Sequence, residues 1–377
     1  MIGFRMPTRV HIAPGCLARL PEAVRSLDAE SVLLVVDPGL QATEWPRKAQ
    51  RALTENDVRC EVFDAVEANP RTSTATAAAE TIRGAGLKGV VALGGGSVLD
   101  TAKAAAMLAA NEGRIEHLEG KNRYSRQPLP MVAIPTTCGT GSEVTWVSVL
   151  THRPTRTKIS VKGETMFPDQ ALVDAELIRT LPSSMVAATG FDALTHALEA
   201  TTCRAANPVS DALAEKAIAL LFRYLARAAE DVGGDAEARE AVMRASTVAG
   251  LAFGNADVAG VHCLSESLGG LFDVPHGVTN AILVEPVLRH HRPAIESRLA
   301  DLDLMLSPPD GEASADHFFA ALGDLRRQLG IPGFAALKIP REGYPEVAAA
   351  AARNNSNGSN PQPMGAGDYL RILESLD

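Results

Sequence analysis

Aromatic side chains and positive charge are both scarce in this chain of 377 residues. Aromatic residues make up 4% of it, so stacking platforms for nucleobases are not in evidence. The formal net charge is −9, and no basic stripe is visible along the sequence. Because binding to phosphate backbones needs such a stripe, we expect no nucleic-acid partner.

Long apolar runs and paired cysteines are also missing. No apolar run approaches the roughly 20 residues that cross a bilayer, and residues 1–15 lack the apolar core of a secretory signal. We therefore expect no membrane partner. The five cysteines are odd in number, scattered and never arranged as CxxC, which favours reduced thiols in a cytoplasm over a disulfide framework or a zinc ribbon.

The first half of the chain contains a regular alternation of strand and helix signals. Short apolar runs predict strands at 31–37, 60–66, 89–95 and 130–137. Helical patterns lie between them at 45–55, 74–83 and 100–110. Continuous apolar strands that alternate with helices predict a parallel, Rossmann-like sheet covered on both faces.

The second half has a different character. From about Ser183 onward, apolar residues recur at helical spacing and strand signals are few. We predict a domain boundary near Leu181–Pro182, with an α/β domain at 1–181 and an all-α domain at 182–377. A polar stretch at 354–367 is expected to be a loop before one last short helix.

Two loops of the first half have compositions that suit a nucleotide. GGGSVLDTAK (94–103) follows a predicted strand and opens a helix, whose free N–H groups suit a pyrophosphate, and Ser97 can cap that helix or donate to a phosphate oxygen. A tight strand-to-helix turn is the alternative interpretation. PTTCGTGSEVT (135–145) follows the next strand, and its hydroxyls suit ribose and phosphate. These hydroxyls belong to Thr136, Thr137, Thr140 and Thr145. Two such loops at adjacent strand ends favour a nucleotide site.

Asp37 closes the first predicted strand. Its carboxylate can accept hydrogen bonds from a ribose diol and would repel a 2′-phosphate, which favours NAD over NADP. An Asp that caps a turn is the alternative interpretation.

Four residues that are far apart in the chain form a candidate metal-ligand set. Asp192 and His196 have an i, i+4 spacing, which places both side chains on one face of a helix. His262 lies in a helix-like run, and His276 follows Pro275. One carboxylate and three imidazoles suit Zn²⁺ or Fe²⁺ and leave room for a substrate oxygen. Because histidines also cap helices and fill cores, the pattern alone leaves this site a hypothesis.

Four segments, in this order, resemble the signature segments of the iron-containing (group III) alcohol dehydrogenases. They are GGGSVLDTAK, PTTCGTGSEVT, ATGFDALTHALEA and GVH…VPHGVTNAILV, and the resemblance covers nearly the whole chain. It implies an NAD-binding domain at 1–181, a metal-binding helical domain at 182–377 and an active site in the cleft between them. It also implies a homo-oligomer, a dimer or larger, in which Fe²⁺ is favoured and Zn²⁺ is the alternative. The implied metal ligands are Asp192, His196, His262 and His276.

The resemblance also implies a set of contacts to NAD(H). In the resembled family, the residue matching Asp100 reaches the nicotinamide or ribose side and the one matching Lys158 approaches the ribose. Without the resemblance, Lys158 would be interpreted as a surface lysine. The full set is Asp37, Gly95, Gly96, Ser97, Asp100, Thr136, Thr137, Thr140, Thr145 and Lys158.

One position departs from the family pattern. Many members have a second histidine four residues after the third metal ligand, and it is often assigned to proton transfer. This chain has Glu266 there. We expect Glu266 to be the catalytic proton relay, provided that burial raises its pKa. An extra metal ligand and a hydrogen bond within the helix are the alternatives.

The implied reaction is hydride transfer between NAD(H) and a small primary alcohol or its aldehyde on a metal centre. A substrate with an anionic group is also possible, because positive charge is available at Arg153, Arg156 and the run 289–292. Charged runs, however, usually form solvated surface. The substrate pocket is expected to include Trp146, Val147, Phe253 and Cys263. Alternative functions are a maleylacetate reductase or a dehydroquinate synthase of the same fold, and a non-catalytic NAD-binding protein.

Overall fold

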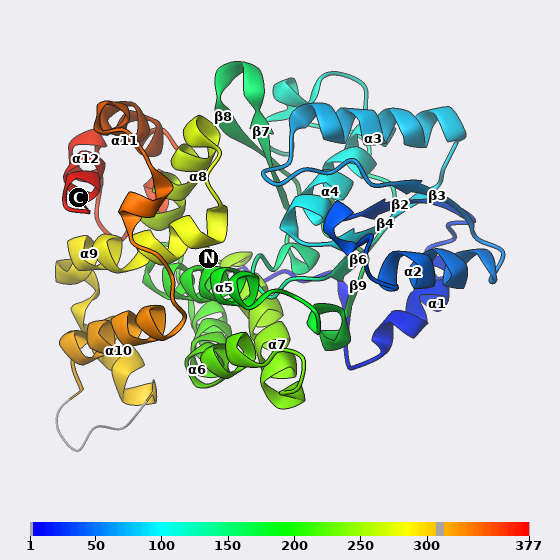
Figure 1. The fold of residues 1–377 in the computed structure, drawn as a ribbon. Coiled ribbons are helices and arrows are strands. Elements are labelled where there is room, and N and C mark those ends of the chain that lie inside the picture. The colour runs from blue at the N-terminus through cyan, green and yellow to red at the C-terminus, as the bar shows by residue number, and fades with distance from the viewer. Residues whose placement is uncertain (1–2, 307–312, 377) are drawn as a thin grey trace. The chain divides into compact units, whose positions relative to one another are not determined.

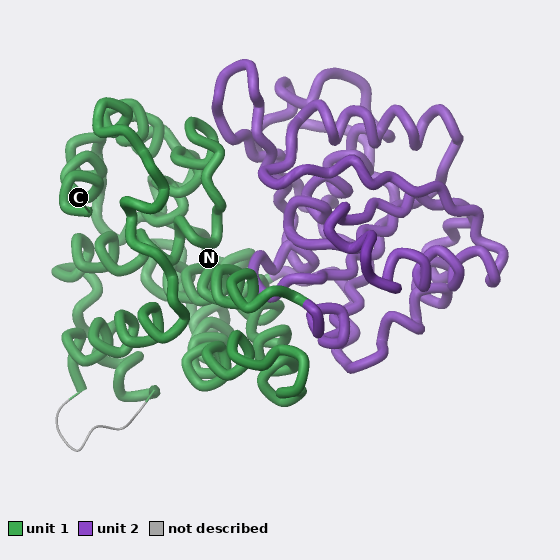
Figure 2. The backbone as a smooth tube through the Cα atoms, viewed as in Figure 1, with its two compact units in different colours: residues 1–4, 181–377 green, residues 5–180 purple. Residues whose placement is uncertain are grey.

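The computed structural model describes residues 3–306 and 313–376. The chain divides into two compact units, residues 5–180 and residues 1–4 with 181–377 (Figure 2). The first is called the α/β unit and the second the helical unit. Among the described residues, no helix combines the length and apolarity that a membrane crossing needs.

A six-stranded parallel sheet forms the centre of the α/β unit (Figure 1). Its strand order is β1-β9-β6-β4-β2-β3, and every pairing in it is parallel. The strands are β1 (Arg9–Ile12), β2 (Ser31–Val36), β3 (Arg59–Phe63), β4 (Gly89–Gly94), β6 (Met131–Pro135) and β9 (Gln170–Val173).

The central strands are buried on both faces, as their continuous apolar sequences require. In β2, Leu33 and Val35 point into a core formed with α3 and α4, whereas Leu34 and Val36 point into a core formed with α1 and α2. Figure 1 shows these two helix pairs on opposite faces of the sheet. The helices are α1 (Leu20–Arg25), α2 (Trp45–Thr54), α3 (Thr72–Ala85) and α4 (Gly96–Ala110).

A small second sheet, which the sequence analysis did not predict, completes the α/β unit. It pairs β5 (Gly120–Lys121) with β8 (Thr157–Lys162), and β8 with β7 (Val147–His152) in an antiparallel hairpin. Polar and apolar residues are mixed in the hairpin strands, so they lack the continuous apolar signal of the main sheet.

The helical unit contains no strand among its described residues. Its helices are α5 (Ser183–Thr202), α6 (Pro208–Glu230), α7 (Ala236–Phe253), α8 (Gly260–Phe272), α9 (His276–Leu306), α10 (Ala315–Gln328), α11 (Tyr344–Ala352) and α12 (Ala366–Glu374). The prediction of a parallel sheet followed by a helical region is therefore confirmed.

Candidate active site

Three helices of the helical unit supply the four predicted metal ligands. Asp192 and His196 lie one turn apart on the buried face of α5. His262 lies in the first turn of α8, and His276 is the first residue of α9. Because α9 packs against both α5 and α8, the ligands come close together although they are distant in sequence.

The structure brings three of these ligands to a common point. The Nε2 atoms of His196 and His262 are 3.0 Å apart, and one ligand atom from each of Asp192, His196 and His262 lies within 4.8 Å of the others. His276 lies beside this group and is partly exposed. Its Nε2 is 3.8 Å from Asp192 Oδ1, but it is outside the tightest set.

Burial and opposite charges control the protonation of this cluster. Burial raises the pKa of the Asp192 carboxyl, but the facing imidazoles outweigh it and hold that pKa below its ordinary value. Burial lowers the pKa of His262, but the carboxylates of Glu199, Asp192 and Glu266 together outweigh it, so the net shift is upward. An ionised carboxylate among imidazoles is a suitable donor set for a divalent cation.

Asn280 of α9 provides a test of whether these residues fit a metal ion. Its Nδ2 is 2.6 Å from Asp192 Oδ1, 3.1 Å from His276 Nε2 and 3.2 Å from His262 Nε2. One amide group has only two N–H hydrogens for these three atoms. Its Oδ1 is buried and has no hydrogen-bond partner in the described structure. Three potential ligand atoms that converge on one point, with too few N–H hydrogens there to satisfy them all, fit a cation.

Sequence reasoning missed Asn280. It lies one turn after His276, at the i+4 position that shares a helix face. That spacing was the available signal, but only the packing of α9 on α5 shows that the amide meets the ligands.

Glu266 lies one turn after His262 on α8, so both side chains are on the same face of the helix. Its Oε2 accepts a hydrogen bond of 2.7 Å from Asn354 Nδ2. It is one of the charges that raise the pKa of His262, which places it electrostatically near the cluster.

Phe253, expected in the substrate pocket, stacks on His196 with ring centroids 4.3 Å apart.

The predicted nucleotide-binding loops lie at neighbouring strand ends in the α/β unit. The backbone N–H of Asp37 donates to Leu93 O at 3.1 Å, and that of Thr136 donates to Gly94 O at 3.0 Å. From β2 the chain moves to β3 on one side and then returns to β4 on the other. The ends of β2 and β4 therefore form a switch point of the kind where open α/β sheets bind ligands.

Glycine is required where the two loops meet. A Cβ on Gly96 would lie 2.5 Å from Thr140 Cγ2, and one on Gly95 would lie 3.0 Å from Thr137 Cγ2. Helix α4 begins at Gly96, earlier than the predicted start at Asp100, and no side chain caps it. Backbone bonds to Gly95 O begin at Val98 N and Leu99 N, so the N–H groups of Gly96 and Ser97, which precede them, are suited to a pyrophosphate. Ser97 lies in this first turn.

Asp37 supports both interpretations of its sequence position. Its Oδ1 accepts a hydrogen bond of 2.8 Å from Gly39 N, as a turn-capping Asp does. This bond uses one of the two carboxylate oxygens and leaves Oδ2 for a ribose hydroxyl.

Asp100, the expected nicotinamide-side residue, is held by donors of the protein itself. Its Oδ1 accepts from Ser142 Oγ at 2.6 Å and its Oδ2 from Val149 N at 2.8 Å. Burial raises the pKa of this carboxyl, and the charge of Lys158 on β8 is among the effects that oppose the rise. Lys158 is thus electrostatically near Asp100 in the same unit.

A buried lysine, which sequence reasoning missed, lies beneath these loops. Lys103 Nζ donates to Val147 O at 2.7 Å and to Thr145 O at 3.1 Å, and it lies 3.2 Å from Thr145 Oγ1. Burial lowers its pKa to about 8, although the Asp100 carboxylate, 3.7 Å away, opposes the shift. Lys103 thereby fixes the end of the threonine-rich loop on α4.

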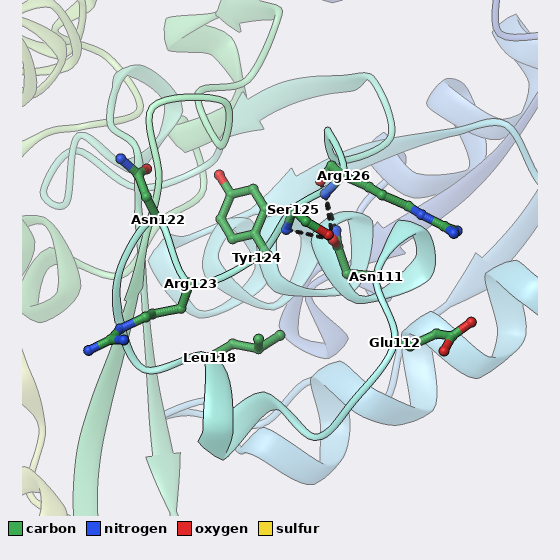
Figure 3. A pocket seen from close by; sticks show the side chains of 8 residues that line it. All are labelled: Asn111, Glu112, Leu118, Asn122, Arg123, Tyr124, Ser125 and Arg126. Atoms are coloured by element: carbon green, nitrogen blue, oxygen red, sulfur yellow. Dashed lines mark hydrogen bonds between the residues drawn. The ribbon is translucent and has the colours of Figure 1, made fainter.

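A hollow of about 490 Å³ in the α/β unit does not involve the predicted site (Figure 3). Figure 3 shows the Asn111 side chain holding the backbone of Ser125 and Arg126 in its wall. None of the predicted metal or cofactor residues is among its lining residues, which are Asn111, Glu112, Leu118, Asn122, Arg123, Tyr124, Ser125 and Arg126.

Comparison with known proteins gives matches along nearly the whole chain. Residues 7–175 match the family model described as iron-containing alcohol dehydrogenase, and residues 186–376 match the C-terminal model of the Fe-containing alcohol dehydrogenase family. An NAD-dependent methanol dehydrogenase from Bacillus methanolicus is 32% identical over 380 residues, covering 100% of both chains.

Solved structures agree with these matches. A 1,3-propanediol oxidoreductase superposes with a TM-score of 0.96 at 32% identity, covering 100% of each chain. A sulfoacetaldehyde reductase from Bifidobacterium kashiwanohense, solved in complex with NAD⁺, superposes with a TM-score of 0.89 at 28% identity, covering 100% of this chain and 98% of that one.

Proposed function

Because the chain belongs to the iron-containing alcohol dehydrogenase family, we propose that it interconverts a small primary alcohol and its aldehyde with NAD(H) at the Asp192, His196, His262 and His276 site. It is an oxidoreductase that acts on CH–OH groups and uses NAD(H) with a divalent metal. The observation that carries the proposed site is the convergence of Asp192, His196 and His262 within 4.8 Å of one another.

The proposed metal ligands divide into a buried set and a more accessible one. Asp192, His196 and His262 are buried, and His276 is partly exposed. When bound, the divalent cation supplies positive charge that polarises the substrate oxygen, and NAD(H) supplies the hydride chemistry. The family favours Fe²⁺, and Zn²⁺, which accepts the same ligand types, is the alternative.

The proposed NAD(H) site is the switch point of the parallel sheet. The first turn of α4 would receive the pyrophosphate, and Asp37 Oδ2 would accept from the adenosine ribose and disfavour a 2′-phosphate. The remaining proposed contacts are Gly95, Gly96, Ser97, Asp100, Thr136, Thr137, Thr140, Thr145 and Lys158. Asp100 accepts hydrogen bonds from Ser142 and Val149, and Thr145 accepts one from Lys103. Both residues therefore also hold the threonine-rich loop in place.

Glu266 is the proposed proton relay. The hydrogen bond from Asn354 orients the Glu266 carboxylate. Because Glu266 lies one turn after the proposed metal ligand His262, its carboxylate is placed to lie near the oxygen of a bound substrate. A carboxylate in that position can accept the alcohol proton during oxidation and return it during aldehyde reduction.

We propose an uncharged substrate in preference to an anionic one. Arg289 and Arg292, two of the basic residues considered for anion binding, are paired with Glu285 and with Glu296 and Asp316, respectively. The carboxylate of Glu266 would also repel an anion near the metal. Because one structural relative is a sulfoacetaldehyde reductase, aldehydes with an anionic group are included in the test below.

The experiment is a screen of purified protein loaded separately with Fe²⁺ or Zn²⁺ against aldehydes and alcohols, with NADH and NADPH. We expect turnover of short uncharged aldehydes with NADH, together with bound metal. A clear preference for NADPH would contradict the role of Asp37, and faster turnover of sulfonated or carboxylated aldehydes would contradict the uncharged substrate.

The five cysteines form no disulfide, which supports the proposal of a cytoplasmic protein. We also propose a homo-oligomer, a dimer or larger. Light scattering during size-exclusion chromatography should then give a molar mass of at least two chains.

A further inference from the structure

A buried carboxylate on α5, which the proposed reaction does not use, lies against the first turn of α8. Glu199 is 2% exposed, and both of its oxygens are engaged. Its Oε2 lies 2.5 Å from His262 Nδ1, and its Oε1 accepts a hydrogen bond of 2.7 Å from the backbone N–H of Val261.

The position of Glu199 follows from helix geometry. Asp192, His196 and Glu199 are spaced i, i+4 and i+7, so they share one face of α5. The face that presents two metal ligands therefore also presents the carboxylate that contacts the third. Glu199 links the ligands of α5 to the ligand of α8.

The contact determines which nitrogen of His262 carries hydrogen. An ionised carboxylate is an acceptor only, so the Nδ1 atom must be the donor in the pair. In the neutral imidazole, Nε2 then carries the lone pair. That atom lies 3.0 Å from His196 Nε2 and 3.2 Å from Asn280 Nδ2, within the ligand cluster.

We propose that Glu199 is a positioning residue of the metal centre, which fixes the tautomer and the ring orientation of His262. The inference rests on the proposed metal site. Metal-binding histidines commonly donate their second N–H to a carboxylate, which orients the ring and increases its basicity.

A purely structural role makes a different prediction. Glu199 also accepts from an N–H in the first turn of α8, so it could serve only to satisfy that helix end. Its loss would then lower stability, while each folded molecule would bind metal as tightly as before.

The deciding experiment is a titration of metal-free protein with Co²⁺, followed by visible absorption, with the dissociation constant obtained by chelator competition. Glu199→Gln is the test variant, because it keeps the size of the side chain but removes its charge and one acceptor. Asp303→Asn is the matched control, since it alters a buried carboxylate of the helical unit that accepts a backbone N–H from Ser314. Circular dichroism verifies that each variant is folded.

We expect Glu199→Gln to bind Co²⁺ about 10- to 100-fold more weakly, with an altered ligand-field spectrum, and Asp303→Asn to match the wild type. An unchanged affinity and spectrum in folded Glu199→Gln would overturn the inference and leave the proposed function intact. A wild type that binds no metal would overturn both. If Glu199→Gln does not fold, Glu199→Asp is measured instead, because its shorter side chain cannot reach both partners, and the same outcomes decide.

Discussion

Among individual residues, Glu266 is the proposed proton relay, and its substitution tests that role directly. We expect Glu266→Gln to keep its metal, because the four ligands are untouched, and to lose about 10²–10⁴-fold in turnover, as the loss of a general base does. Turnover and metal content are measured on the same sample. Metal loss would instead indicate a ligand, and unchanged turnover would exclude the proton relay.

Lys103 gives a pH-dependent prediction. Burial lowers its pKa from 10.5 to about 8, so between these values the unfolded chain binds more protons than the folded one. The free energy of unfolding should therefore rise with pH across this window, by at most about 1.4 kcal/mol per pH unit from this group. Denaturant titrations at pH 7 to 10 should show a shallower rise for Lys103→Met. The exposed Lys216→Met should retain the wild-type slope, and equal slopes for all three proteins would contradict the account.

The chemical roles of individual residues could be predicted from the sequence, but the residues that contact them could not. Asp192 and His196 could be paired from their i, i+4 spacing alone. Glu199 and Lys103 could not be recognised, because a Glu or Lys inside a helix usually faces solvent. Only the folded structure shows that both are buried, with Glu199 against His262 and Val261 of α8 and Lys103 against the end of the threonine-rich loop.

At the level of the helices, the proposed metal centre depends on close contact between α5 and α9. A Cβ on Gly277 would lie 2.7 Å from the carbonyl oxygen of Ala188 and 3.6 Å from Asp192 Cβ. We expect Gly277→Ala to force the start of α9 away from α5, to cost about 1–3 kcal/mol of stability and to weaken metal binding. Thermal unfolding and Co²⁺ affinity measure the two effects.

Gly333→Ala is the matched control, because a Cβ there meets no atom within 4 Å. If Gly277→Ala behaved like that control, the close approach of the two helices would not matter for the site.

The elements with strong periodic signals were predicted well, and those with weak signals were not. The apolar strand at 89–95 was found as β4 at Gly89–Gly94. The predicted start of α4 is too late because glycine is a poor helix former and gives a weak helical signal. The helix nevertheless begins at Gly96, where the close approach of Thr140 leaves no room for a Cβ. The hairpin of β7 and β8 was missed because its strands mix polar and apolar residues.

For the molecule as a whole, a metal ion bound at the proposed site, whose ligands come from three helices, should stabilise the folded chain. Binding to the native state alone adds about 2.7 kcal/mol when the free metal is at 100 times its dissociation constant. We expect added Fe²⁺ or Zn²⁺ to raise the unfolding temperature of the wild type. Asp192→Asn should show a much smaller rise, and an equal rise in both would indicate binding elsewhere.

The most direct test of the account is the metal content and turnover of one set of samples: wild type, His262→Ala, His276→Ala and the exposed control His317→Ala. We expect about one metal ion per chain and full turnover in the wild type and the control, and a joint collapse of both in the two ligand variants. Full turnover in a variant that has lost its metal would contradict the account.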